Sequence, residues 1–129
     1  MIAVDTNVIV RLLTGDDARQ AKRAQALFLQ ESVYLPKTVM LEADWVLRRL
    51  YGFSAHDVAE ALSGLIALPN VRCEDVAVMV DALEWARKGL DFADALHLSS
   101  SRMAGKFATF DVRLARQAKK FADIEVISP

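Results

Sequence analysis

The chain has 129 residues, enough for one domain with a single hydrophobic core. Its composition, 53% hydrophobic and 26% charged, is that of a globular protein and excludes a disordered or fibrous one. The net charge of −1 favours no particular partner, although it leaves room for a local charged patch. The single cysteine, Cys73, cannot form an internal disulfide, so we expect a cytoplasmic protein, and we expect neither a signal peptide nor a membrane span.

The N-terminal stretch predicts a short strand followed by a helix. Residues 2–4 form an apolar run, which is typical of a strand that is buried on both faces. Asp5 follows at the carboxyl end of that strand, and Thr6 or Asn7 can cap a helix over residues 8–13. Ligands bind at the carboxyl ends of central strands in open α/β sheets. Asp5 is therefore either a helix cap or a site residue.

Strands and helices alternate along the rest of the chain. The expected strands cover residues 33–35, 71–73, 107–110 and 124–127. The expected helices cover residues 18–29, 37–51, 54–68, 74–88, 91–104 and 112–121. This alternation predicts a parallel sheet with helices on both faces, and no linker or repeat interrupts it. We therefore expect a single domain over residues 1–129.

The helix over residues 37–51 carries two acids in different surroundings. The helix is apolar almost all round, which predicts that it is mostly buried. Asp44 precedes Arg48 by one turn, a spacing that suits an ion pair at the surface. Glu42 has mostly apolar helical neighbours, so we expect it to be paired with Arg49, protonated or bound to a metal.

Three further acids stand at predicted helix starts. Asp91 is a natural N-cap, and Asp94 falls in the first turn, where an acid suits the helix dipole. Asp111 follows a predicted strand, as Asp5 does, and each of these acids alone has the ordinary interpretation of a helix cap. Strand carboxyl ends and the following helix starts share one edge of a parallel sheet. Four carboxylates are expected to gather at that edge: Asp5, Glu42, Asp94 and Asp111. The four carboxylates repel one another unless a cation neutralises them. A set of oxygen donors without cysteine suits Mg²⁺ or Mn²⁺.

Four short motifs follow one another along the chain: Val4-Asp5-Thr6-Asn7, Leu41-Glu42, Asp91-Phe92-Ala93-Asp94-Ala95 and Thr109-Phe110-Asp111. In this order and spacing they resemble the motifs of PIN-domain ribonucleases, and most of all those of VapC-type toxins from toxin–antitoxin pairs. The resemblance implies a three-layer α/β/α fold with a central parallel sheet. It also implies a site for Mg²⁺ or Mn²⁺ on Asp5, Glu42, Asp94 and Asp111. Thr6, Thr109 and Asp91 would then orient the carboxylates or water around that site.

The same resemblance implies a reaction and a set of partners. The reaction is metal-assisted hydrolysis of single-stranded RNA, which needs no side-chain nucleophile. The implied partners are RNA, a second copy of the chain and a cognate antitoxin that covers the acidic pocket. Four basic residues of the C-terminal third offer a rim that RNA can contact: Arg102, Lys106, Arg113 and Arg116. Solvated helix faces show the same excess of basic residues.

Three other functions fit parts of the pattern. A phosphatase of the haloacid dehalogenase type would need a second aspartate two residues after Asp5, where Asn7 stands. A receiver domain would use Thr109 and Lys106, but no central strand offers the phosphate-accepting aspartate. A PIN domain kept as a scaffold would bind RNA without cutting it.

Overall fold

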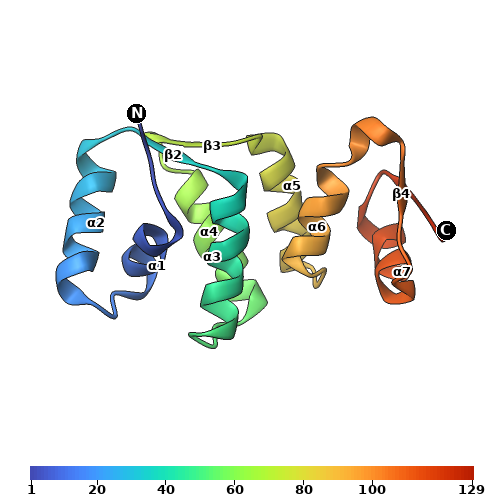
Figure 1. Cartoon of the computed structure of the whole chain (residues 1–129), viewed down its shortest axis with the longest axis horizontal. Coiled ribbons are helices and arrows are strands. Elements are labelled where there is room, and N and C mark those ends of the chain that lie inside the picture. Colours follow the sequence, from blue (N-terminus) through green and yellow to red (C-terminus); the bar gives the residue numbers. More distant parts are fainter.

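The computed structural model describes all of residues 1–129, and helices alternate with strands along them (Figure 1). The strands are β1 (Ile2–Ala3), β2 (Val33–Leu35), β3 (Val71–Cys73), β4 (Lys106–Ala108) and β5 (Glu125–Ile127). The α-helices are α1 (Thr6–Thr14), α2 (Ala18–Gln30), α3 (Lys37–Arg49), α4 (Ala55–Ile66), α5 (Val76–Arg87), α6 (Phe92–Ser99) and α7 (Val112–Phe121). A short 3-10 helix, η1, covers Arg102–Ala104. The predicted α/β class is confirmed, and every predicted strand is present within one or two residues.

The strands are all parallel, as predicted, and they lie in two separate sheets. One sheet has the order β1-β2-β3, and the other consists of β4 and β5. Figure 1 shows β1 near the N-terminus and β4 near the other end of the molecule, with α3 to α6 between them. β1 and β4 therefore each have a strand on one side only, in place of the single central sheet that the sequence predicts.

β1 is more exposed than its composition predicts. Ile2 is 40% exposed and Ala3 is also exposed, whereas Val4 just beyond them is buried. The prediction of a strand buried on both faces is wrong, because β1 forms the edge of its sheet and Ile2 and Ala3 are both exposed.

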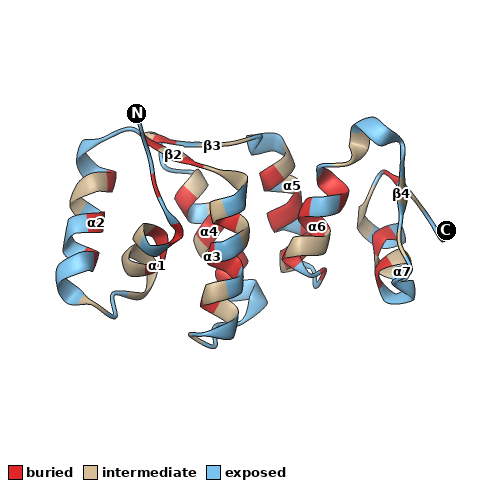
Figure 2. Ribbon diagram, viewed as in Figure 1, coloured by how far each residue is buried: buried red, intermediate tan, exposed pale blue.

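A single hydrophobic core runs through the molecule and is formed mainly by side chains of the helices. Its largest fully buried side chains include Ile9, Leu35, Met40, Leu62 and Leu98. Figure 2 shows the buried residues on the facing sides of α3, α4, α5 and α6, with the outer sides exposed. The C-terminal segment joins the same core through three residues: Leu114, Ala118 and Ile124.

Two helices differ from their predicted form. The helix expected over residues 91–104 ends at Ser99, because the Ser101 hydroxyl donates to the His97 carbonyl at 2.6 Å and η1 follows. The helix expected over residues 37–51 ends at Arg49, and it is not mostly buried, since Trp45 is 51% exposed. None of the helices combines the length and the apolarity that crossing a bilayer requires.

Candidate functional site

The N-terminus of α6 holds two of the predicted acids. Asp91 caps the helix, as predicted, because its Oδ2 accepts a hydrogen bond from the Asp94 amide at 3.3 Å. Asp94 lies one turn in and is half-buried. The cap therefore fixes the main chain from which the Asp94 carboxylate projects.

Asp111 occupies the corresponding place between β4 and α7. Its Oδ1 accepts a hydrogen bond from the Leu114 amide at 3.0 Å, which makes it the N-cap of α7. The Asp111 amide in turn donates to Oγ1 of Thr109 at 3.0 Å. Thr109 therefore positions Asp111 through the main chain, by a hydrogen bond of the kind that starts many turns.

These acids share one cavity, which we call the α6–α7 cavity. It measures about 340 Å³, and its lining includes Asp91, Asp94, Asp111 and Arg113. Burial raises the pKa of Asp94, and the charges of Asp91 and Asp111 raise it further, while His97 opposes them. Crowded carboxylates of this kind bind a proton or a cation more readily than an isolated acid does.

Glu42 lies on a neighbouring cavity, which we call the α3–α6 cavity. This cavity measures about 440 Å³ and is lined in part by Glu42, Asp44 and Ala93, so it lies between α3 and the first turn of α6. Glu42 is exposed and forms no ion pair with Arg49. Of the three alternatives for Glu42, the internal pair with Arg49 is therefore wrong, because Glu42 is exposed on α3.

Asp44 is buried, although the sequence predicts that it lies at the surface. Its side chain is 5% exposed and receives three hydrogen bonds from Arg48, at 2.8, 3.0 and 3.1 Å. Arg48 also reaches Asp91 at 3.5 Å. Burial raises the pKa of Asp44 even though Arg48 opposes the shift. The predicted surface pair is thus a buried one, and through Arg48 it ties α3 to the cap of α6.

Asp5 is separated from the other acids. It caps α1, with Oδ1 accepting from the Thr6 amide at 2.7 Å, so Asp5 and not Thr6 or Asn7 is the cap. Asp5 is exposed and lines neither acidic cavity. The Thr6 hydroxyl is buried without a hydrogen-bond partner. Buried polar atoms in proteins are normally hydrogen-bonded, so the Thr6 hydroxyl is an exception.

The chemistry of the predicted ligands suits a divalent cation, but their positions within one chain do not bring them together. The predicted ligands are all carboxylates, the oxygen donors that Mg²⁺ and Mn²⁺ prefer. Asp94 and Asp111 line one cavity, Glu42 lines the adjacent one and Asp5 lies apart. No three acid, histidine or cysteine side chains come close enough in this chain to hold one ion.

The predicted RNA-contacting residues have different surroundings. Arg102 is bound to Asp81 at 2.7 Å and Asp123 at 2.9 Å, and its guanidinium lies over the Trp85 ring. Lys106 pairs with Glu125. Arg113 lines the α6–α7 cavity, and Arg116 is exposed on α7. Of the four, Arg113 is therefore the best placed to meet a phosphate that enters that cavity.

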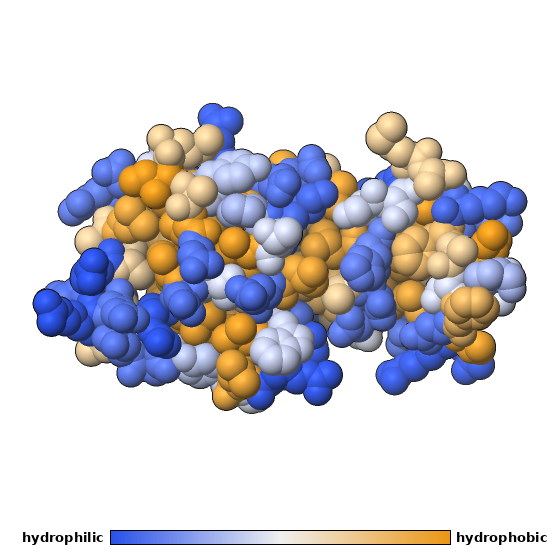
Figure 3. All heavy atoms as spheres, viewed as in Figure 1, coloured by the Kyte–Doolittle hydropathy of each residue, from blue (hydrophilic) through white to orange (hydrophobic).

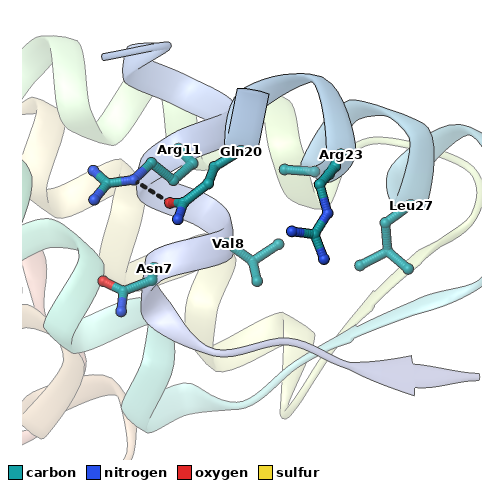
Figure 4. A pocket seen from close by; sticks show the side chains of 7 residues that line it. Asn7, Val8, Arg11, Gln20, Arg23 and Leu27 are labelled. Carbon is teal, nitrogen blue, oxygen red and sulfur yellow. Dashed lines mark hydrogen bonds between the residues drawn. The ribbon is translucent and has the colours of Figure 1, made fainter. Parts of the chain in front are cut away.

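A third cavity lies between α1 and α2 and carries arginines without any acid. It measures about 350 Å³, and Arg11 and Arg23 line it together with Asn7. Figure 4 shows Arg11 donating to Gln20 across this cavity, with Arg23 on the neighbouring helix. This cavity lacks the carboxylates that a metal site needs.

A match to a known protein family agrees with the motifs. The family model of the PIN domain matches residues 2–120. A solved structure of VapC20 from Mycobacterium tuberculosis, a toxin that cleaves the sarcin-ricin loop, is 24% identical to this chain. The match covers 97% of this chain and 99% of that one, with a TM-score of 0.46. No curated protein matches the sequence.

Proposed function

Because the chain belongs to the PIN domain family, we propose that it is an endoribonuclease that hydrolyses phosphodiester bonds of RNA with Mg²⁺ or Mn²⁺. The observation that supports this most is the α6–α7 cavity, where Asp94 and Asp111 from separate helix starts face the same space. Asp111 caps α7, but Asp94 caps neither helix, because the cap of α6 is Asp91. A half-buried carboxylate without a capping role, placed beside a second one, suits a hydrolytic site that works on phosphate.

The proposed chemistry assigns a separate task to each group of residues. A divalent ion would activate water and neutralise charge on the phosphate, with Asp5, Glu42, Asp94 and Asp111 as its ligands. Asp91 would hold the main chain of Asp94, and Thr109 that of Asp111, through the hydrogen bonds described above. The pKa of Asp94 is raised by burial first and then by the charges of Asp91 and Asp111, and a bound cation would oppose both effects.

Substrate binding would rely on positive charge beside the acids. Arg113 lies in the lining of the same cavity, and Arg116 follows one turn later on α7. Contacts of this kind hold the RNA backbone and carry no sequence information, so they predict affinity that falls with salt. Arg102 and Lys106 would contribute only if RNA displaced their present acidic partners.

The proposed biological setting is that of a VapC-type toxin. In that setting the chain would act in the cytoplasm as a homodimer, and a cognate antitoxin would cover the acidic pocket. The family membership supports this setting, since the PIN domain model matches residues 2–120.

Expression in bacterial cells tests the proposed activity. Wild-type protein should arrest growth and create discrete new RNA 5′ ends, detected by sequencing. Asp5→Asn should do neither, whereas the matched control Asp57→Asn, a change on the exposed start of α4, should behave like the wild type. Equal toxicity and equal cutting by wild type and Asp5→Asn would refute the site. RNA bound but never cut would favour the scaffold.

A further inference from the structure

The edge of β1 is suited to a neighbouring strand and lacks one. Ile2 donates its amide to Ser32 at 2.8 Å and Val4 donates to Tyr34 at 3.3 Å. Because successive residues of a parallel strand direct their main-chain groups to opposite sides, those of Ala3 point away from β2. The other edge of this sheet, on β3, carries the exposed charge of Arg72, a common protection against further pairing. The β1 edge has no such charge.

The edge of β4 is its counterpart. The Thr109 amide donates to the Ile127 carbonyl at 3.0 Å, so Phe107 and Thr109 direct their main-chain groups to β5. Those of Lys106 and Ala108 then point away from β5. β1 and β4 thus each present an open edge for parallel pairing, and Ala3 and Ala108 on these edges are both small and exposed.

The β4 strand of the same chain is held away from β1. Leu114, Ala118 and Ile124 are buried in the core. Arg102 anchors the start of the C-terminal segment to Asp81 on α5. Figure 1 shows α3 to α6 between the two edges. In this arrangement, only a strand from another molecule can reach the β1 edge.

The exposed surface is large enough for such a contact. The chain exposes 7600 Å², whereas a compact monomer of 14.3 kDa exposes about 6,800 Å². The excess of about 800 Å² is what each partner buries in an interface of standard size. Figure 3 shows a constriction before the C-terminal part and apolar side chains on the surface beyond it. Phe110, just after β4, and Val112, the first residue of α7, are 82% and 70% exposed.

We infer that two copies of this chain exchange strands, so that β4 of each copy pairs with β1 of the other and the two sheets become continuous. The exchange would seat the carboxyl end of β4 beside the carboxyl end of β1. Asp111 and its neighbour Asp94 of one copy would then face Asp5 of the other. The buried Thr6 hydroxyl next to Asp5, which has no partner in one chain, lies where that contact forms.

The choice of β4 rather than β5 as the pairing strand rests on the proposed function. Only β4 ends in Asp111, so only its pairing with β1 completes the proposed carboxylate set. Each dimer would contain two equivalent sites, related by a two-fold axis. A site of this kind is absent from a single chain, in agreement with the scattered carboxylates described above.

Cross-linking between differently tagged chains tests the exchange without reference to activity. One chain carries Ala3→Cys and the other Ala108→Cys, both in a Cys73→Ser background, and a short bismaleimide is added after co-expression. We expect a covalent dimer that contains both tags, and little product when Ala77→Cys on α5 replaces Ala108→Cys. The absence of that dimer, or an equal yield with the control, would overturn the exchange. A link formed within one chain by the double variant Ala3→Cys/Ala108→Cys would also overturn it.

Mixing two inactive variants provides the second arm. Asp5→Asn and Asp111→Asn each destroy both sites of their own dimer, but a mixed dimer keeps one site with both aspartates. Random pairing makes half of the dimers mixed, so co-expression should restore about a quarter of the wild-type rate of RNA cleavage. No recovery, with a wild type that cleaves, would overturn the exchange and leave the nuclease proposal intact. An inactive wild type would refute the nuclease proposal, and the cross-link would still decide the exchange.

Discussion

Removal of Arg48 should destabilise the protein strongly, because it leaves Asp44 buried without its partner. The Asp44 side chain is 5% exposed and depends on three hydrogen bonds from Arg48. Breaking a buried pair on one side costs about 3–5 kcal/mol, because an uncompensated charge remains. The contact of Arg48 with Asp91, at 3.5 Å and 46% exposed on the acid, adds little to this figure. We therefore expect Arg48→Ala to lose about 3–5 kcal/mol of unfolding free energy.

The loss should depend on pH in a defined direction. Burial already raises the pKa of Asp44 above its ordinary value, and without Arg48 it must rise further. A carboxyl whose folded pKa is raised contributes stability below its unfolded pKa and loses it as the pH rises through the folded pKa. The defect of Arg48→Ala should therefore be largest near neutral pH and shrink in acid.

Urea denaturation followed by tryptophan fluorescence at about pH 7 and about pH 5 measures both effects. The matched control is Arg49→Ala, an exposed residue without an ion pair, which should change stability by about 0.5 kcal/mol or less. The double variant Asp44→Leu/Arg48→Met should be close to the wild type, since apolar replacement of both partners is often tolerated. A loss in Arg48→Ala no larger than in Arg49→Ala, or a loss that grows in acid, would refute the reasoning.

Four further changes have defined outcomes. Burial raises the pKa of the Cys73 thiol to about 11, so iodoacetamide should modify it slowly at about pH 8. Rapid alkylation, detected by mass spectrometry, would contradict this. Ser54→Ala removes the cap bond to the Asp57 amide and should cost about 1 kcal/mol in thermal unfolding, whereas no change would contradict the cap. Leu62→Ala, at a fully buried position, should cost about 2–5 kcal/mol by the same measurement, and a loss below that range would contradict its burial. Arg113→Ala should weaken RNA binding for all sequences and reduce the salt slope by about 1, whereas an unchanged slope would exclude it as a phosphate contact.

The local elements were predictable because their signals lie within a few residues. Ser54 caps α4 and Asp91 caps α6, as their spacing predicts, and α7 covers the residues expected for it. The end of α6 was not predictable from its apolar pattern. There the Ser101 hydroxyl donates a hydrogen bond to a main-chain carbonyl, and the spacing of apolar residues does not predict such a bond.

The two acids of α3 show why burial was harder to predict. Glu42 and Asp44 are two residues apart, which places them about 200° apart around the helix, so only one of them can face the core. Apolar neighbours along the sequence favoured Glu42, but the contact of α3 with α6 buries Asp44 instead. That contact joins segments far apart in the chain, and no local pattern determines it.

For the candidate site, the sequence indicates which carboxylates to consider but not how they are arranged. Asp94 and Asp111 share a cavity, as the sequence predicts, because both stand at helix starts on one side of the molecule. Asp5 stands apart because β1 pairs only with β2, while β4 pairs with β5 in a separate sheet, and no local pattern in the sequence determines which strands become neighbours. The apolar run at residues 2–4 predicted a strand buried on both faces, whereas Ile2 and Ala3 are exposed at the edge of the sheet.

Cleavage of single-stranded RNA by the purified protein tests the proposed site most directly. With Mg²⁺, wild type and the control Asp57→Asn should cut at the same positions and at equal rates. Asp94→Asn, and wild type with a chelator, should be slower by at least about 100-fold, because the ions and their ligands supply the charge stabilisation. Cleavage by Asp94→Asn at the wild-type rate would contradict the assignment of these carboxylates to a nuclease site.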